Sequence, residues 1–186
     1  DRPTYQGLTG GIDGNGYLSS ADWSKPSAAG FTLFLVLRND DAADNVTQAT
    51  LIDNPNHSNF ALGVRTRSGG TVQINSRDDT DASTGYSRVN DDTTGFADFS
   101  EWSVLTVTQH LSGGDLIERS RYNDNAEDNQ RTISSSPGIE HGELTLRADD
   151  GGSNIMDGPI RLAAATQRVF PTDVETSIIR TLMRTL

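Results

Sequence analysis

The sequence contains no cysteine, only one lysine (Lys25), and no long hydrophobic run. Without cysteine, neither disulfide bonds nor thiol chemistry can contribute to stability or catalysis. No apolar segment approaches the ~20 residues that a membrane-spanning helix requires, so we expect no membrane insertion. With one lysine, the positive charge rests on 14 arginines against 26 acidic residues, and the net charge is −11. Because phosphate binding needs concentrated basic side chains, this balance argues against nucleic acid as a partner.

The chain length and the ratio of aspartate to glutamate limit the possible fold classes. A chain of 186 residues with 33% hydrophobic content predicts a single domain spanning residues 1–186 with a sizeable core. Aspartate outnumbers glutamate by 20 to 6, which is typical of a loop-rich β protein, since aspartate suits turns and glutamate suits helices. The chain starts at Asp1 and not at methionine, which predicts a processed chain or a piece of a longer one.

Strand patterns dominate the sequence. Phe31 to Arg38 is nearly continuously apolar, as expected of a strand buried on both faces. Phe60 to Arg67 and Thr71 to Arg77 predict a hairpin around a Ser-Gly-Gly turn, and Trp102 to Gln109 with Asp115 to Tyr122 predicts a second. About ten short strands separated by glycine and asparagine turns predict an all-β fold, an antiparallel β-sandwich or jelly roll.

The remaining segments have less regular hydrophobic patterns. Further strands are expected at Ala49 to Ile52, Glu143 to Ala148 and Gly158 to Thr166. The polar stretch from Asp78 to Gly95 predicts a long loop or short edge strands, and Asn123 to Ser136 predicts a loop.

One short C-terminal helix is predicted from about Thr172 to Leu186. Thr172 is a natural N-cap, and Glu175 three residues later completes a capping box, with Phe170 just outside. Helical spacing places six apolar residues on one stripe that should dock on the sandwich: Val174, Ile178, Ile179, Leu182, Met183 and Leu186.

The order of these segments resembles the concanavalin A-like lectin and glucanase sandwiches, and within them the laminin-G-like (pentraxin-like) modules. An early F-D-G-x-D-D-Y-L turn is similar to Ile12 to Leu18, and an F-T-L strand ending in arginine is similar to Phe31 to Arg38. The W-x-x-v-t-v-t and l-t-i-G strands are similar to Trp102 to Thr108 and to Leu144 to Arg147, and the closing segment to Met156 to Glu175. Two departures are the family's closing-strand glutamate, replaced near Leu162, and its l-x-v-N-G motif, lost after the tryptophan strand.

Enzymes of this superfamily provide an alternative that the residues do not favour. A glucanase needs paired carboxylates on one strand face, roughly 5 Å apart. The nearest pair here, Glu140 and Glu143, is three residues apart and would point to opposite faces of a strand. The lyase motif that the resemblance implies is incomplete, because Gln73-Ile74-Asn75 carries asparagine where the family has histidine.

A row of polar side chains on the first hairpin is the candidate binding site. Strand alternation places Arg65, Arg67, Gln73, Asn75 and Arg77 on the face opposite to the apolar residues. Guanidinium and amide groups on a rigid sheet suit sugar hydroxyls and the carboxylates of acidic glycans. A solvated sheet face, or one covered by a neighbouring subunit, explains the same pattern.

Calcium is the ion that the resemblance implies. Asp78, Asp79 and Asp81 form one candidate loop of hard oxygen ligands, although turn-forming aspartates give the same composition.

These observations favour a non-enzymatic recognition or adhesion module that binds a glycan or a protein, located outside the cell or on a cell or virion (phage) surface. A structural virion or surface-layer domain that contacts only protein subunits is one alternative. A polysaccharide lyase or glycosidase of the same fold is the other.

Overall fold

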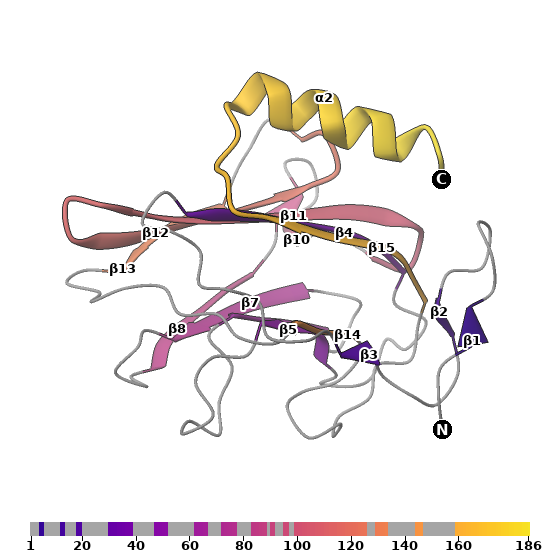
Figure 1. The fold of residues 1–186 in the computed structure, drawn as a ribbon, viewed down its shortest axis with the longest axis horizontal. Coiled ribbons are helices and arrows are strands. Elements are labelled where there is room, and N and C mark those ends of the chain that lie inside the picture. Colours follow the sequence, from indigo (N-terminus) through magenta and orange to yellow (C-terminus); the bar gives the residue numbers. More distant parts are fainter. Residues whose placement is uncertain are drawn as a thin grey trace.

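The protein is described here from a computed structural model. The structure describes residues 4–5, 12–13, 18–19, 30–38, 47–51, 62–66, 72–77, 83–88, 90–91, 95–96, 99–125, 129–133, 144–146 and 159–186, with side chains in 30–38, 99–125, 130–132 and 159–186. Two antiparallel sheets are stacked face to face, and one helix, α2 (Thr172–Met183), lies on the outer side of the larger sheet (Figure 1).

The larger sheet has seven strands, and its register is set mainly by the long central pair. In spatial order its strands are β1 (Thr4–Tyr5), β2 (Ile12–Asp13), β15 (Ile160–Thr166), β4 (Phe31–Leu37), β11 (Ser103–Ser112), β12 (Asp115–Tyr122) and β13 (Asn129–Ile133). Strand β11 pairs with β4 from Gln109 opposite Phe31 to Ser103 opposite Leu37.

The second sheet has six strands, and a short two-stranded pair stands apart from it. In spatial order the six are β3 (Leu18–Ser19), β14 (Leu144–Leu146), β5 (Thr47–Leu51), β6 (Leu62–Thr66), β7 (Val72–Arg77) and β8 (Ser83–Arg88). The separate pair is β9 (Asn90–Asp91) with β10 (Gly95–Phe96). All pairings in the described strands are antiparallel, so the predicted sandwich is confirmed.

The predicted hairpins and the buried central strand are also confirmed. Strands β6 and β7 pair, as do β11 and β12, whose connection uses Gly113 and Gly114 at φ values of 63° and 91°. Positive φ at both positions is what a tight hairpin turn requires, and glycine adopts it without steric cost. All seven residues of β4 are buried, as the apolar run from Phe31 predicts.

One predicted loop is wrong, and one ambiguous segment contains a real strand. Asn123 to Ser136 was expected to be loop, but β13 lies within it and pairs with β12, Arg131 standing opposite Glu118. The segment from Asp78 to Gly95 includes β8, the edge strand of the six-stranded sheet. Both strands are polar and lie at sheet edges, where the hydrophobic pattern gives little signal.

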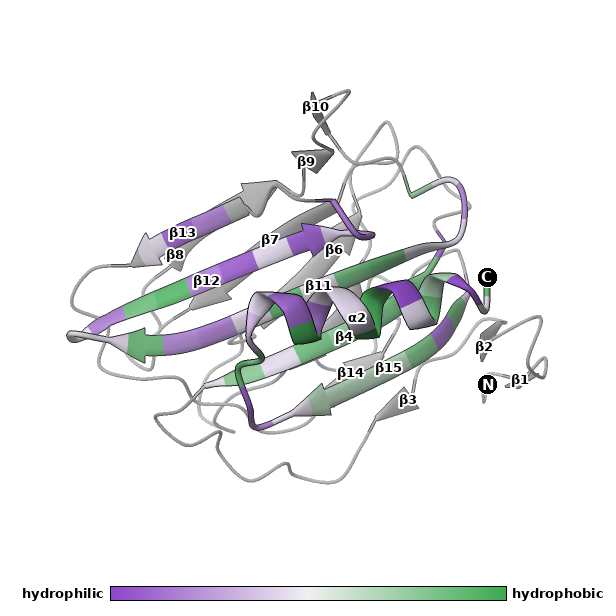
Figure 2. Cartoon of the chain, turned by 90° about the horizontal axis from the view of Figure 1, so that it is seen from above, coloured by the Kyte–Doolittle hydropathy of each residue, from purple (hydrophilic) through white to green (hydrophobic). Residues whose placement is uncertain are grey.

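The outer face of the seven-stranded sheet grades from apolar to polar along the strands. At one end Val36 and Val104 join a cluster with Phe34 and the helix, and Figure 2 shows hydrophobic residues along β4, β11 and β15 beneath α2. Towards the other end Thr32 bonds to Thr108 (3.3 Å) and donates to the Arg168 carbonyl (2.7 Å), which ties the linker before α2 to the sheet.

Helix α2 docks by its apolar stripe, but the stripe differs from the prediction in two places. Ile179 is fully buried, and Ile178, Leu182 and Met183 pack around it against the sheet. Val174 and Leu186 are each 40% exposed, so their assignment to the stripe is wrong. The buried position in the first turn belongs to Glu175 instead. Its spacing of three, four, seven and eight residues from Ile178, Ile179, Leu182 and Met183 places it on the same face of the helix.

The predicted capping box is also wrong. Pro171 occupies the N-cap position, Thr172 is already helical, and no side chain caps the helix. The Thr172 hydroxyl instead accepts a bond from Arg119, and the Glu175 carboxylate binds arginines of β12. Glu175 turns towards the sheet and not back along its own helix, because on the sheet its carboxylate meets two guanidinium groups of opposite charge.

Among the residues that the structure describes, no helix is both long enough and apolar enough to cross a membrane.

Candidate functional site

Strand register brings part of the predicted polar row together on the six-stranded sheet. Arg65 of β6 pairs with Gln73 of β7, and Asn75 of β7 pairs with Gly63 two residues before Arg65. Since alternate residues of a strand share a face, Arg65, Gln73 and Asn75 lie on one side of this sheet. The apolar Val64 and Ile74 are paired with each other and belong to the other side.

Strand β8 extends the row with two residues that the sequence pattern did not single out. Arg88 pairs with Gln73, and Tyr86 pairs with Asn75. A bulge then shifts the pairing, and Arg77 stands opposite Ser83. Arg88 and Tyr86 were missed because the segment from Asp78 to Gly95 has no clear alternation of apolar and polar residues, so its register could not be assigned.

The other predicted site residues lie outside the described part of the chain. These are Arg67 of the polar row, the candidate calcium ligands Asp78, Asp79 and Asp81, and the two candidate catalytic carboxylates Glu140 and Glu143. Within the described residues, no group of three or more histidine or carboxylate side chains could hold a metal ion.

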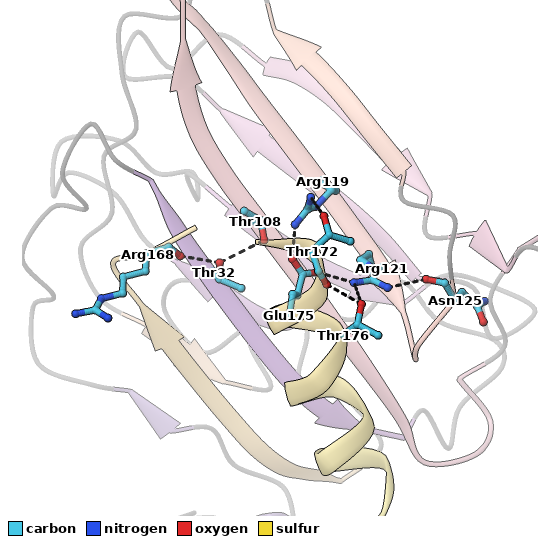
Figure 3. Close-up of polar contacts among 9 residues, drawn as sticks. All are labelled: Thr32, Thr108, Arg119, Arg121, Asn125, Arg168, Thr172, Glu175 and Thr176. Carbon is cyan, nitrogen blue, oxygen red and sulfur yellow. Dashed lines mark hydrogen bonds and ion pairs between the residues drawn. The ribbon is translucent and has the colours of Figure 1, made fainter. Parts of the chain in front are cut away.

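A network of charges joins α2 to the outer face of β12. Glu175, which is fully buried, forms ion pairs with Arg119 and with Arg121, the latter at 3.5 Å (Figure 3). Arg121 is 2% exposed and also donates to the Thr176 hydroxyl and to the Asn125 carbonyl, both at 2.9 Å. These contacts hold α2 on the sheet, so the role of this network is structural.

A second buried network lies on the opposite side of the same strand. Glu118 accepts one bond from the Gln109 amide at 2.7 Å and forms an ion pair with Arg131 of β13 at 3.0 Å. Residue alternation along β12 explains the arrangement, since Glu118 falls between Arg119 and Ile117 and points away from α2. This network holds the edge strand β13 in register.

The C-terminal end of α2 is fixed by an aromatic stack. The guanidinium groups of Arg161 and Arg38 lie 4.3 Å and 5.5 Å from the centre of the Trp102 ring, and Arg161 also donates to the Thr185 carbonyl at 2.9 Å. A cation at the last turn of a helix interacts favourably with the helix dipole. Both ends of α2 are therefore held by arginines of the sheet.

The sequence carried only a partial signal for these networks. The loss of the family's l-x-v-N-G motif between Asp115 and Arg119 marks the strand that bears Glu118 and Arg119. The replacement near Leu162 has a physical reason, because Leu162 packs in the apolar cluster beneath α2. Neither observation identifies which side chains pair.

The two stacked antiparallel sheets with one C-terminal helix define a concanavalin A-like sandwich of the laminin-G type, as the sequence resemblance predicted. Solved structures of this class match the chain over most of its length. The heptameric SAP-like pentraxin from Limulus polyphemus matches with a TM-score of 0.61 and 10% identity, over 91% of this chain and 79% of that chain.

Botulinum neurotoxin domains match in the same way. The binding domain of serotype G has a TM-score of 0.60 and 11% identity, over 91% of this chain and 44% of its own. The binding domain of neurotoxin DC, solved in complex with rat synaptotagmin II, has a TM-score of 0.57 and 11% identity, over 83% of this chain and 36% of its own. The chain thus spans less than half of each neurotoxin domain.

Sequence comparison adds nothing to the structural result: no protein-family model and no curated protein matches this chain. At 10–11% identity the structural matches establish the fold alone.

Proposed function

We propose that this chain is a non-enzymatic recognition module that binds an acidic glycan through the outer side of its six-stranded sheet. The observation that carries the proposal is the register row in which Arg65, Gln73 and Arg88 stand side by side on three adjacent strands. Such a module acts outside the cell, on a cell surface or on a virion.

The geometry of the row suits a sugar. Cross-strand neighbours lie ~5 Å apart and successive residues on one face ~7 Å apart, which is the scale of one sugar ring. Arginine binds carboxylates through two parallel hydrogen bonds, and the amides of Gln73 and Asn75 can both donate to and accept from hydroxyls. Helix α2 lies on the opposite side of the molecule from this sheet (Figure 1).

An acidic ligand can be attracted only by a local cluster of arginines, because the chain as a whole is negatively charged. A chain of net charge −11 repels an anion at long range, so arginines concentrated in one row must supply the attraction. The binding roles named for the matched neurotoxin domains are consistent with a recognition role for the same sandwich. They leave the ligand open, since the fold hosts many functions.

Calorimetric titration with a heparin-derived tetrasaccharide tests the site. We expect Arg65→Ala to weaken binding about three- to tenfold at low ionic strength, because it removes one of the charged contacts, with less difference at higher salt. The matched control is Arg168→Ala, which removes an exposed arginine from the linker before α2. Equal affinity of the two variants, with unchanged melting temperatures, would contradict the proposed site.

A further inference from the structure

The exposed side of α2 carries two arginines, Arg180 and Arg184, four residues apart. At short range such a pair attracts an anionic group even on a chain of net charge −11.

A hollow of about 430 Å³ lies along the exposed side of α2. The described residues that line it form one polar stripe of the helix: Asp173, Thr176, Ser177, Arg180, Thr181 and Arg184. The volume falls within the range of small-ligand sites, but the hollow is open to solvent and its described lining comes from α2 and the residue after it. The described lining contains hydroxyls, guanidiniums and one carboxylate, and no apolar or aromatic side chain.

The groups in the hollow differ in how firmly they are held. Thr176 and Thr181 donate to helix carbonyls four residues before them, at 2.7 Å and 2.9 Å, and Arg180 binds Asp124 at 3.0 Å. The exposed side chains of Ser177 and Arg184 form no hydrogen bond or ion pair with any residue that the structure describes. These two groups can therefore turn to a ligand without breaking a described contact.

The lining chemistry identifies the ligand class. Arg180 and Arg184 are four residues apart and hence neighbours on the helix surface, about 6 Å apart at Cβ, a spacing that suits a carboxylate or sulfate group. Serine, threonine and aspartate side chains can bond to ring hydroxyls, whereas a ligand that relies on apolar contact would find little surface. The described lining has two positive charges and one negative charge, and Arg180 is also paired with Asp124 beside it.

We propose that this stripe of α2 is a second binding site, for an anionic saccharide carrying carboxylate or sulfate groups. It is separate from the polar row on the six-stranded sheet, because α2 and that sheet lie on opposite sides of the seven-stranded sheet (Figure 1). The site does not depend on the proposed role of Arg65.

The test uses calorimetric titration with a heparin-derived tetrasaccharide, and with maltotetraose as the neutral probe. All proteins carry Arg65→Ala together with Arg88→Ala, which remove both arginines of the register row, so that the remaining binding reports on the helix site. We expect the tetrasaccharide to bind and maltotetraose to bind at least about tenfold more weakly. Adding Arg184→Ala should weaken tetrasaccharide binding about three- to tenfold. Ser177→Trp should abolish binding by filling the hollow, whereas Arg168→Ala should have no effect.

Three outcomes would overturn the site: no binding of the tetrasaccharide, equal affinity in the Arg184, Ser177 and Arg168 variants, or equal affinity for both probes. A mass increase with concentration in light scattering that Arg184→Ala abolishes, without saccharide binding, would overturn it in favour of a protein partner. If the Arg65→Ala and Arg88→Ala changes together remove all binding, the polar row stands and the helix site fails. If Arg65→Ala has no effect but Arg184→Ala does, the reverse holds.

Discussion

Glu175 shows how one buried charge can decide the docking of a helix. Its carboxylate lies between Arg119 and Arg121 of β12, at the polar end of the sheet, while Ile179 and its neighbours cover the apolar end. The direction in which α2 lies on the sheet follows from this match, because reversing the helix would bury Glu175 among Val36, Val104 and Phe34.

We predict that Glu175→Gln lowers the free energy of unfolding by about 3–5 kcal/mol, because the change leaves the buried guanidinium of Arg121 without its carboxylate. Urea denaturation measures the loss. The control Asp173→Asn removes an exposed acidic group from the same helical turn and should cost less than about 1 kcal/mol. Similar losses in the two variants would mean that the buried pair does not hold the helix.

Gly30 is a second position where a single atom matters. It has a φ of 86°, and a Cβ atom built on it would lie 2.2 Å from the Gln109 backbone oxygen and 2.6 Å from the His110 Cβ. Both neighbours belong to β11, whose register with β4 is fixed along seven residue pairs, so they cannot move away.

We expect Gly30→Ala to destabilise the protein by more than about 3 kcal/mol, from the clash together with the unfavourable φ. Gly113→Ala provides the comparison, because Gly113 also has a positive φ, 63°, but its Cβ would meet no atom within 4 Å. That variant should lose only about 1–2 kcal/mol. Thermal and urea unfolding of both decide the matter, and a Gly30 variant no weaker than the Gly113 variant would refute the close approach.

Among the helices and strands, those with a clear hydrophobic period were predicted from the sequence, and those that depend on contacts with distant residues were missed. The apolar run of β4, the β11–β12 hairpin and the existence of α2 follow from local patterns and turn glycines. Strand β13 did not, because its polar residues are stabilised by an ion pair between Arg131 and Glu118 that only the folded register creates. The capping box failed for the same kind of reason, since Glu175 has a stronger partner on another strand.

The residues of the candidate site can be divided in the same way, into those that the sequence predicted and those that it did not. Alternation predicted that Arg65, Gln73 and Asn75 share a face, and the register places them so. Arg88 and Tyr86 could not be predicted as part of the row. Which residues of the edge strand β8 stand beside Gln73 and Asn75 depends on a bulge in the pairing.

Helix α2 should contribute strongly to stability through one residue. Ile179→Ala removes a fully buried side chain from the cluster with Phe34, Val36 and Val104, and we expect a loss of about 2–5 kcal/mol. Val174→Ala, five residues earlier and 40% exposed, should change stability by less than about 0.5 kcal/mol. If the two variants melt at the same temperature, the helix is not docked as described.

In the whole molecule, the two proposed binding sites lie on different layers. These layers are the six-stranded sheet and the side of the seven-stranded sheet that bears α2. The first carries a register row with two arginines, and the second carries Arg180 and Arg184 on α2. Both are suited to anionic ligands, although they are built on different elements.

The proposed binding of acidic glycans, as opposed to contact with protein subunits alone, is tested most directly by a glycan-array screen of the unmodified protein, once with calcium and once with a chelator. We predict retention of glycans that carry carboxylate or sulfate groups, and little retention of their neutral counterparts. A signal lost with the chelator would place calcium in the interaction, as the resemblance implies for Asp78, Asp79 and Asp81. An array on which no glycan is retained under either condition would contradict the claim and favour a structural surface domain.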